Sequence, residues 1–194
     1  MLRKAILSVV VSSVIVVSAP LVFAHGGAKG VVKERMDLMD NMKDAMKTLS
    51  AIYKGEQEYD ADTVRKAALI IRDHSGDAMT KLFPKGSAHG PSEAKQNIWQ
   101  EWERFEGLAK RQQVISQGLH DSADNRSAGE AKSSGHMMGG GSGSMMGKSM
   151  MGGGHMMGGK MDTPEHYAAM PSEMVFKMLA DNCSSCHTRY RVED

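Results

Sequence analysis

The fold is decided by the segment Asp181-Asn182-Cys183-Ser184-Ser185-Cys186-His187-Thr188-Arg189-Tyr190-Arg191, close to the end of the chain. It contains both cysteines of the protein in the order Cys-x-x-Cys-His, the spacing of a c-type haem attachment site. Two thiols on one helical face can each form a thioether with one vinyl group of a haem, and the next imidazole then lies under the iron. The segment therefore predicts covalent haem c on Cys183 and Cys186, with His187 as proximal iron ligand.

Three other interpretations of the two cysteines are a redox-active dithiol, half of a zinc site and a chance pair. A thioredoxin-like dithiol opens a helix after a strand, and no strand pattern precedes Cys183. A tetrahedral zinc site needs a second pair of ligands, and the chain has no further cysteine. Covalent haem is the interpretation that the sequence favours.

The first 24 residues have the pattern of a secretory signal peptide. Arg3 and Lys4 form a short basic start, and the apolar run that follows ends at Ala24, a small residue suited to cleavage. The alternative is an uncleaved membrane anchor, because the run is long enough to span a bilayer. We expect cleavage, no stable anchor afterwards, and a periplasmic protein, since bacteria attach c-type haem outside the cytoplasm.

The mature chain is nearly neutral, with 22 basic and 23 acidic side chains once Arg3 and Lys4 are removed. It has no basic stripe and few aromatic residues: four Phe, four Tyr and two Trp. These features argue against nucleic acid as a partner. The length suits one domain.

Hydrophobic periodicity predicts four amphipathic helices and no strand. They are expected at residues 31–53, at residues 61–82, from Ser92 to near Gly118, and from Pro171 to the chain end. The seam of the first helix consists of Val32, Arg35, Met39, Met42, Met46, Leu49 and Tyr53. This order predicts an all-α fold, an antiparallel up-down-up-down four-helix bundle.

Residues 121–165 differ from the rest of the chain because they carry no hydrophobic period and repeat Met-Met-Gly with interspersed histidines. A segment so rich in glycine cannot offset its ordering entropy, so we expect a long disordered insertion between the third and fourth helices. The chain thus divides into a signal peptide (1–24), three helices (25–120), the insertion (121–165) and the fourth helix with the haem motif (166–194).

Up-down-up-down packing places the end of the fourth helix beside the start of the first, the end of the second and the start of the third. The expected haem neighbours are Arg35, Met39, Met79, Phe83, Ile98, and Trp99 or Trp102. A guanidinium in the seam can bind a haem propionate through a charge-assisted, bidentate pair, which assigns Arg35 a role. The alternative is an arginine that only extends from a helix flank into solvent.

Met39 lies one helical turn beyond Arg35 on the same face and could bind the iron opposite His187. A stripe of methionines at helical spacing is also typical of core packing, so packing against the haem is the alternative. Met42 is the next candidate ligand. Met46 is expected to lie too far along the helix, and His74 to be a flank or core residue.

These features together resemble class II c-type cytochromes, the family of cytochrome c′ and its low-spin relatives. The matching residues are Cys183, Cys186, His187, Tyr190 and Arg191 in the C-terminal motif, Val31 to Met39, Phe83 to Ser87, and Ile98-Trp99 with Phe105. The insertion departs from the family pattern. The resemblance implies a left-handed bundle, often a homodimer, with the proximal histidine near the surface.

Carried over by position, the resemblance places Arg35 near the propionates, Met39 at the distal side of the haem, and Arg191 close to the proximal histidine. Tyr190 joins them as a cofactor-binding residue of the same motif. Low-spin members of the family ligate a methionine from the first helix and transfer electrons. High-spin members leave the distal site open and bind nitric oxide or carbon monoxide, and some carry an unligated methionine there.

The insertion resembles the thioether-rich stretches of periplasmic copper-handling proteins. Soft thioethers suit monovalent copper, and imidazoles suit copper in either state. The candidate copper ligands are His136, Met137, Met138, Met145, Met146, His155, Met156 and Met157. A solvated linker without metal is the alternative.

The sequence favours a periplasmic protein that carries one electron through a haem ligated by His187 and Met39, exchanging it with another redox protein. Because no substrate is turned over, it is not expected to be an enzyme. The alternatives are a five-coordinate haem that binds nitric oxide or carbon monoxide, and a copper-binding protein acting through the insertion.

Overall fold

The structure is a computed structural model that describes residues 27–127 and 162–192. The predicted signal peptide and most of the predicted insertion lie outside these residues. Among the helices that are described, none is both long and apolar enough to cross a bilayer.

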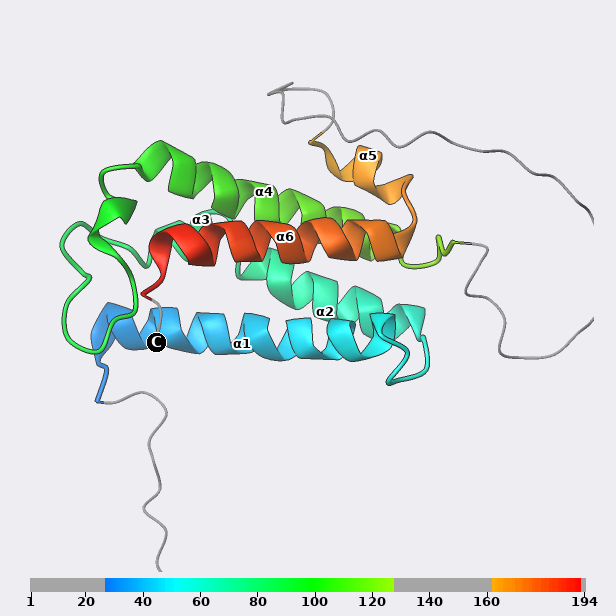
Figure 1. The fold of residues 1–194 in the computed structure, drawn as a ribbon, viewed down its shortest axis with the longest axis horizontal. Helices are drawn as coiled ribbons and strands as arrows, with labels where there is room; N and C mark the ends of the chain where they lie inside the picture. Colours follow the sequence, from blue (N-terminus) through cyan, green and yellow to red (C-terminus); the bar gives the residue numbers. More distant parts are fainter. Residues whose placement is uncertain (1–26, 128–161, 193–194) are drawn as a thin grey trace, which may run out of the picture.

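Four long helices form the bundle: α1 (Gly30–Tyr53), α2 (Ala61–Asp73), α4 (Trp102–Asp121) and α6 (Ser172–Tyr190). They run alternately up and down along one axis (Figure 1). Three short elements connect them: α3 (Asp77–Thr80), η1 (Gln96–Ile98) and α5 (Pro164–Ala168). The described residues contain no strand, only an isolated antiparallel bridge between Ala94 and Arg191. The predicted all-α four-helix bundle is confirmed.

Helix α1 has the predicted length, and its buried stripe recurs every three or four residues: Val32, Arg35, Leu38, Met42, Ala45, Leu49 and Ile52. The predicted seam shares only part of this stripe, because Met39, Met46 and Tyr53 are half-buried on its flank. Met39 and Met46 pack against the edge of the core and also border a cavity. Hydrophobic residues recur every three or four positions both on a helix face that lines a cavity and on one that packs in a core, so periodicity alone does not distinguish the two.

The second predicted helix is two helices, which corrects the expectation of one helix at residues 61–82. Asp60 caps the start of α2 by accepting from the Thr63 amide at 3.0 Å. After α2 the chain turns at Gly76, whose φ of +60° suits glycine, and the Gly76 amide donates to the Ala109 carbonyl of α4 at 2.9 Å. A Cβ at this position would lie 2.6 Å from Gln113 Oε1. The break therefore lets the chain approach α4 closely.

The third predicted helix begins ten residues later than expected, at Trp102 instead of Ser92. The residues before it form an irregular segment with the short helix η1. Their backbone pairs with the chain end: the Lys95 amide donates to Tyr190 at 2.8 Å, and the Val192 amide donates to Glu93 at 2.7 Å. These bonds to a distant segment replace the helical ladder that the sequence predicted.

Both ends of the predicted insertion belong to the fold, so its boundaries of 121 and 165 are too wide. Helix α5 packs on α4, where Gly118 leaves room for the Tyr167 side chain. Before the insertion, Asn125 accepts from the Ser172 amide at 2.8 Å through its carbonyl and donates to the Met170 carbonyl at 2.8 Å. Arg126 pairs with Glu173 at 3.1 Å.

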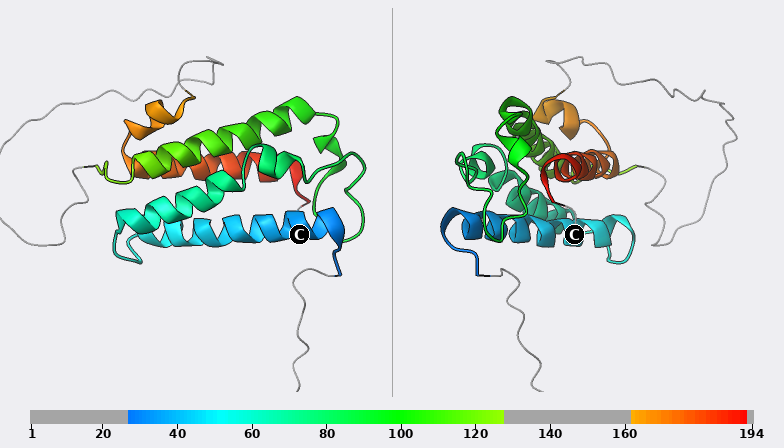
Figure 2. Two further views of the ribbon diagram at one scale, coloured as in Figure 1. Left: turned by 180° about the vertical axis from the view of Figure 1, so that it is seen from behind. Right: turned by 60° about the vertical axis from the view of Figure 1, so that its left-hand side comes forward.

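The long helices pack unequally around the bundle. Helices α2 and α4 are in close contact, as are α4 and α6 and α1 and α2, whereas α1 and α6 make few contacts with each other. Figure 2 shows the same arrangement from two further sides. The separation of α1 from α6 leaves space inside the bundle, and the haem motif lies on α6.

Candidate haem site

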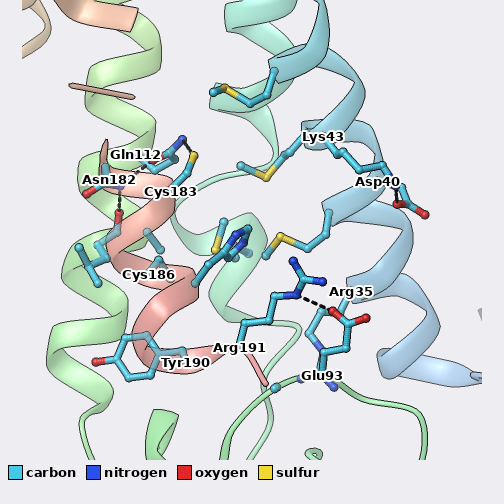
Figure 3. A pocket seen from close by; sticks show the side chains of 18 of the residues that line it. Arg35, Asp40, Lys43, Glu93, Gln112, Asn182, Cys183, Cys186, Tyr190 and Arg191 are labelled. Carbon is cyan, nitrogen blue, oxygen red and sulfur yellow. Dashed lines mark hydrogen bonds and ion pairs between the residues drawn. The ribbon is translucent and has the colours of Figure 1, made fainter. Parts of the chain in front are cut away.

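A cavity of about 810 Å³ lies between α1 and α6 and reaches the residues that precede α4. This volume is within the range of roughly 300–1,000 Å³ typical of ligand and cofactor pockets. Its walls are mainly apolar, and Figure 3 shows side chains from α1, α4 and α6 converging on it.

Cys183, Cys186 and His187 lie together on the α6 side of this cavity. Both cysteines are free thiols, half-buried, and less than one helical turn apart. Burial raises the pKa of the Cys183 thiol, and burial raises the pKa of Cys186 to about 11. Near neutral pH both side chains are therefore protonated thiols.

His187 has an environment that keeps its imidazole neutral. His187 is exposed, yet desolvation of the ring lowers the pKa of His187, and the nearby Arg191 cation lowers it further. A neutral imidazole has a free nitrogen lone pair for a metal. The arrangement thus suits the predicted role of His187 as an iron ligand.

The C-terminal end of α6 is clamped to the segment before α4. Arg191 Nε pairs with Glu93 at 2.6 Å, as drawn in Figure 3, and the Arg191 amide donates to the His187 carbonyl at 2.9 Å. Asn97 donates to the Arg189 carbonyl at 3.1 Å. Because these bonds fix the backbone after His187, they also fix the position from which its ring extends.

Tyr190 is almost fully buried below the cavity, with 3% of its surface exposed. Its hydroxyl donates to Glu101 at 3.0 Å, and its ring meets Phe105 edge-on with centroids 5.5 Å apart. The bond from Arg189 to Glu101 holds the pKa of that carboxyl below its usual value. Tyr190 lines the cavity but also anchors α6 to the rest of the bundle.

Arg35 lines the opposite wall, with only 5% of its surface exposed. Its Nη2 donates to the Ser87 carbonyl and to Ser92 Oγ, both at 3.0 Å, and its guanidinium lies 4.4 Å from the Phe83 ring centroid. Burial lowers the pKa of Arg35. No acidic side chain among residues 27–127 and 162–192 forms an ion pair with it. A carboxylate of a bound group, such as a haem propionate, would supply the missing counter-charge.

Most of the predicted haem neighbours line the cavity: Met39, Met79, Phe83 and Ile98. The tryptophans do not, which corrects that expectation. The Trp99 indole N–H donates to the Phe83 carbonyl at 2.9 Å, and the Trp102 ring packs on Phe105. Both are engaged by the core because the third helix starts later than predicted.

Met46 also lines the cavity, but lining it is no evidence of iron ligation, so the expectation that Met46 lies too far along the helix to bind the iron stays a prediction. The cavity extends along α1 as far as Ser50, beyond the haem end of the bundle. Sequence reasoning did not single out Met36 or Gln112, which also line it. The position of Met36 directly after Arg35 is a signal that could have identified it as a cavity residue, whereas no sequence pattern distinguishes Gln112 from other helical residues.

His74 lies outside the cavity, as expected of a flank histidine. Its Nδ1 is 2.7 Å from the Ile70 carbonyl, and its Nε2 is 3.3 Å from Asn41 Nδ2. In the described part of the chain, no group of three or more His, Cys, Asp or Glu could hold a metal ion. The predicted copper ligands, from His136 to Met157, lie outside the described residues, so copper binding stays a prediction.

Comparison with known proteins agrees with this geometry. The model of the family described as "Cytochrome C′" matches residues 30–141. This match ends before the Cys-x-x-Cys-His motif, so the motif and the family match are separate observations.

Curated relatives include cytochrome c-556 of Agrobacterium tumefaciens (strain B2A), 39% identical over 82 residues, which are 42% of this chain and 66% of that protein. Cytochrome c′ of Rhodopseudomonas palustris is 32% identical over 79 residues, covering 40% of this chain and 53% of the relative. The chain therefore matches less than two thirds of the length of these relatives.

Solved structures share the fold. A mutant of cytochrome c′ from Rhodopseudomonas palustris superposes with a TM-score of 0.57 at 18% identity, covering 86% of this chain and 100% of the other. Cytochrome c prime from Shewanella frigidimarina superposes with a TM-score of 0.57 at 16% identity, covering 84% of this chain and 94% of the other. The bundle, the cavity bordered by the haem motif and the family match lead to one conclusion: this chain belongs to the cytochrome c′ family of haem proteins.

Proposed function

We propose that the protein carries one haem c, bound by thioethers to Cys183 and Cys186 and ligated by His187 and Met39, and that it transfers single electrons. The observation that carries this proposal is that the motif on α6 borders the same cavity as Arg35 and Met39 on α1. Two walls of one cavity thus supply the attachment, the charge partner and both candidate ligands.

The side chains of the cavity would divide the work of holding such a group. Haem supplies the one-electron chemistry of its iron when bound. Arg35, fixed by Ser87 and Ser92, would orient a propionate without having to reorganise. Phe83 and Ile98 provide apolar contact and exclude water, which lowers the local dielectric and makes each nearby charge more effective.

Met39 is proposed as the second ligand because its thioether borders the cavity one turn beyond Arg35. Methionine opposite histidine raises the reduction potential of a haem and closes the site to other ligands. We therefore propose electron transfer, rather than turnover of a substrate, as the role of the protein.

The test is the ligand field of the iron in protein matured by a bacterium that assembles c-type cytochromes. A low-spin spectrum in both oxidation states is expected, with conversion to high spin in the Met39→Ala variant. Met46→Ala is the matched control, because Met46 lines the same cavity two turns further along α1. A spectrum that changes in Met46→Ala and not in Met39→Ala would show that Met39 is not the iron ligand.

A five-coordinate haem that binds nitric oxide or carbon monoxide is the second candidate. It is favoured by the likeness to nitric oxide complexes of cytochrome c prime variants from Alcaligenes xylosoxidans, which superpose with TM-scores of 0.53 and 0.54 at 16% identity. A high-spin iron in both oxidation states, with stoichiometric binding of nitric oxide, would select this function over electron transfer.

We also propose that the chain is exported to the periplasm and exchanges electrons with another redox protein there. This rests on the apolar run ending at Ala24 and on the extracytoplasmic attachment of c-type haem. Amino-terminal sequencing of protein from the periplasmic fraction should begin at His25. Retention of residues 1–24 in the membrane fraction would instead indicate an anchor.

A further inference from the structure

We propose that Gln112 is a positioning residue for the haem, whose side-chain amide binds the sulfur of Cys183 and is itself oriented by Asn182. The inference rests on the proposed haem attachment and adds two residues that the motif does not contain. It concerns one thioether only, because the structure gives Cys183 and Cys186 different surroundings.

The contact is built from buried groups. Gln112 on α4 is 97% buried, and its Nε2 lies 3.0 Å from Cys183 Sγ (Figure 3). Its Oε1 accepts from Asn182 Nδ2 at 2.6 Å, and Asn182 Nδ2 also donates to the Leu108 carbonyl at 3.1 Å. The three side chains thus form a chain of bonds that ends at the sulfur.

The direction of this chain is set by its far end. A backbone carbonyl can only accept, so the Asn182 atom facing Leu108 must be the amide nitrogen. The same nitrogen faces Gln112, so the Gln112 atom beside it must be the acceptor, Oε1. The remaining end of the Gln112 amide, its NH₂ group, then faces Cys183. The orientation follows from the bonds and needs no choice between amide flips.

If these polar side chains served only to fill the core, they would lower the stability of the fold. Asn182 Oδ1 is buried with no hydrogen-bond partner among the described residues, and a buried unsatisfied acceptor lowers stability. A pair of apolar side chains of the same shape would avoid this cost. The polar chain therefore has a better explanation in the sulfur to which it leads.

A hydrogen bond at this sulfur has two consequences. It holds the Cys183 side chain in one position at the cavity wall, so that the sulfur is presented before attachment and stays in place after it. It also directs the positive end of an N–H dipole at the rim of the bound group, which favours the form carrying one more electron. Loss of the donor should therefore lower the reduction potential.

The experiment is redox titration of the purified holoprotein, comparing the wild type with Gln112→Met and with the control Gln113→Met. Gln113 is the exposed neighbour of Gln112 on the same helix, and methionine keeps the length of the side chain. We expect a lower potential in Gln112→Met alone, with an unchanged ligand-field spectrum. Equal potentials in the two variants would overturn the inference.

Asn182→Ala provides a second variant if Gln112→Met does not yield holoprotein. It should shift the potential in the same direction by a smaller amount, and it should add nothing in a Gln112→Met background, because it acts through Gln112. A shift in Asn182→Ala without one in Gln112→Met would refute the proposed order. Absence of covalent haem in the wild type would refute the proposed function instead, so the two failures are distinguishable.

Discussion

Arg35 Nη2 donates to the backbone carbonyl of Ser87 at 3.0 Å, joining α1 to the loop after α3 and holding a buried cation at the edge of the cavity. Burying a charge without an opposite charge is unfavourable, and the described residues provide no ion pair for this guanidinium. A buried guanidinium held in this way, at the cavity that the Cys183–His187 motif also lines, would suit an anionic group of a bound ligand.

Substitution of Arg35 by Met should lower the reduction potential of the haem, because a cation near the iron favours the reduced form. A differential interaction of about 1 kcal/mol corresponds to roughly 40 mV in a one-electron couple, and a shift of that order is expected. Redox titration measures it. Lys33→Met, an exposed position on the same helix, is the control and should leave the potential unchanged. Equal shifts of the reduction potential in both variants would contradict the proposal that Arg35 binds a propionate.

The contact of Glu101 with Arg189 and Tyr190 should make the stability of the C-terminal end depend on pH. The hydrogen bond from Arg189 lowers the pKa of Glu101, so the contact stabilises the fold above the unfolded pKa of about 4.3 and is lost as the pH falls through the lower, folded value. Glu101→Gln should thus melt at a lower temperature than the wild type at pH 7.

The same two proteins should converge in thermal midpoint as the pH falls through the lowered, folded pKa of Glu101, since the wild-type carboxyl then becomes protonated. Thermal melts followed by circular dichroism at a series of pH values measure this. A difference in midpoint that stayed constant down to pH 2 would show that Glu101 acts through its shape and not its charge.

Gly118→Ala should destabilise the protein, because a Cβ there would lie 2.1 Å from Tyr167 Cβ and force α5 away from α4. The expected loss is about 1–3 kcal/mol in the free energy of unfolding, as for other overpacked sites. Gly107→Ala is the matched control on the same helix, where no atom lies within 4 Å of the new Cβ. That variant should gain roughly 0.5–1 kcal/mol from helix propensity. Denaturant titration of both variants measures their free energies of unfolding. Equal changes in the two variants would contradict the close packing of α5 on α4 at Gly118.

The Met/His-rich segment predicts a separate measurement with monovalent copper. Full-length protein should bind more copper than a variant lacking residues 135–161, because thioethers and imidazoles suit this ion. Titration against a competing chelator gives the stoichiometry. Equal stoichiometry in the two proteins would leave the segment as a linker.

Periodicity and motif spacing predicted the features that depend on residues close together in the sequence. The Cys183–His187 motif is of this kind, as is the part of the α1 stripe formed by Val32, Arg35, Met42 and Leu49. Up-down-up-down packing then predicted that Arg35 and Met39 would border the same cavity. The antiparallel arrangement needed only short connections and amphipathic faces.

What the sequence did not predict depends on contacts between distant segments. The break at Gly76 is stabilised by the Ala109 carbonyl of another helix, and the irregular chain before Trp102 by backbone bonds to Tyr190. Helix α5 needs the space left by Gly118. In the sequence Gln112 looks like any other helical residue, and only the folded structure shows that its side-chain amide contacts Cys183.

The most direct test of the account is the intact mass of protein matured by a bacterium with a c-type cytochrome assembly system, combined with titration of its thiols. We expect the mass of residues 25–194 increased by one haem, and no reactive thiol, because Cys183 and Cys186 would both have formed thioethers. An unmodified polypeptide mass with two titratable thiols would contradict the account.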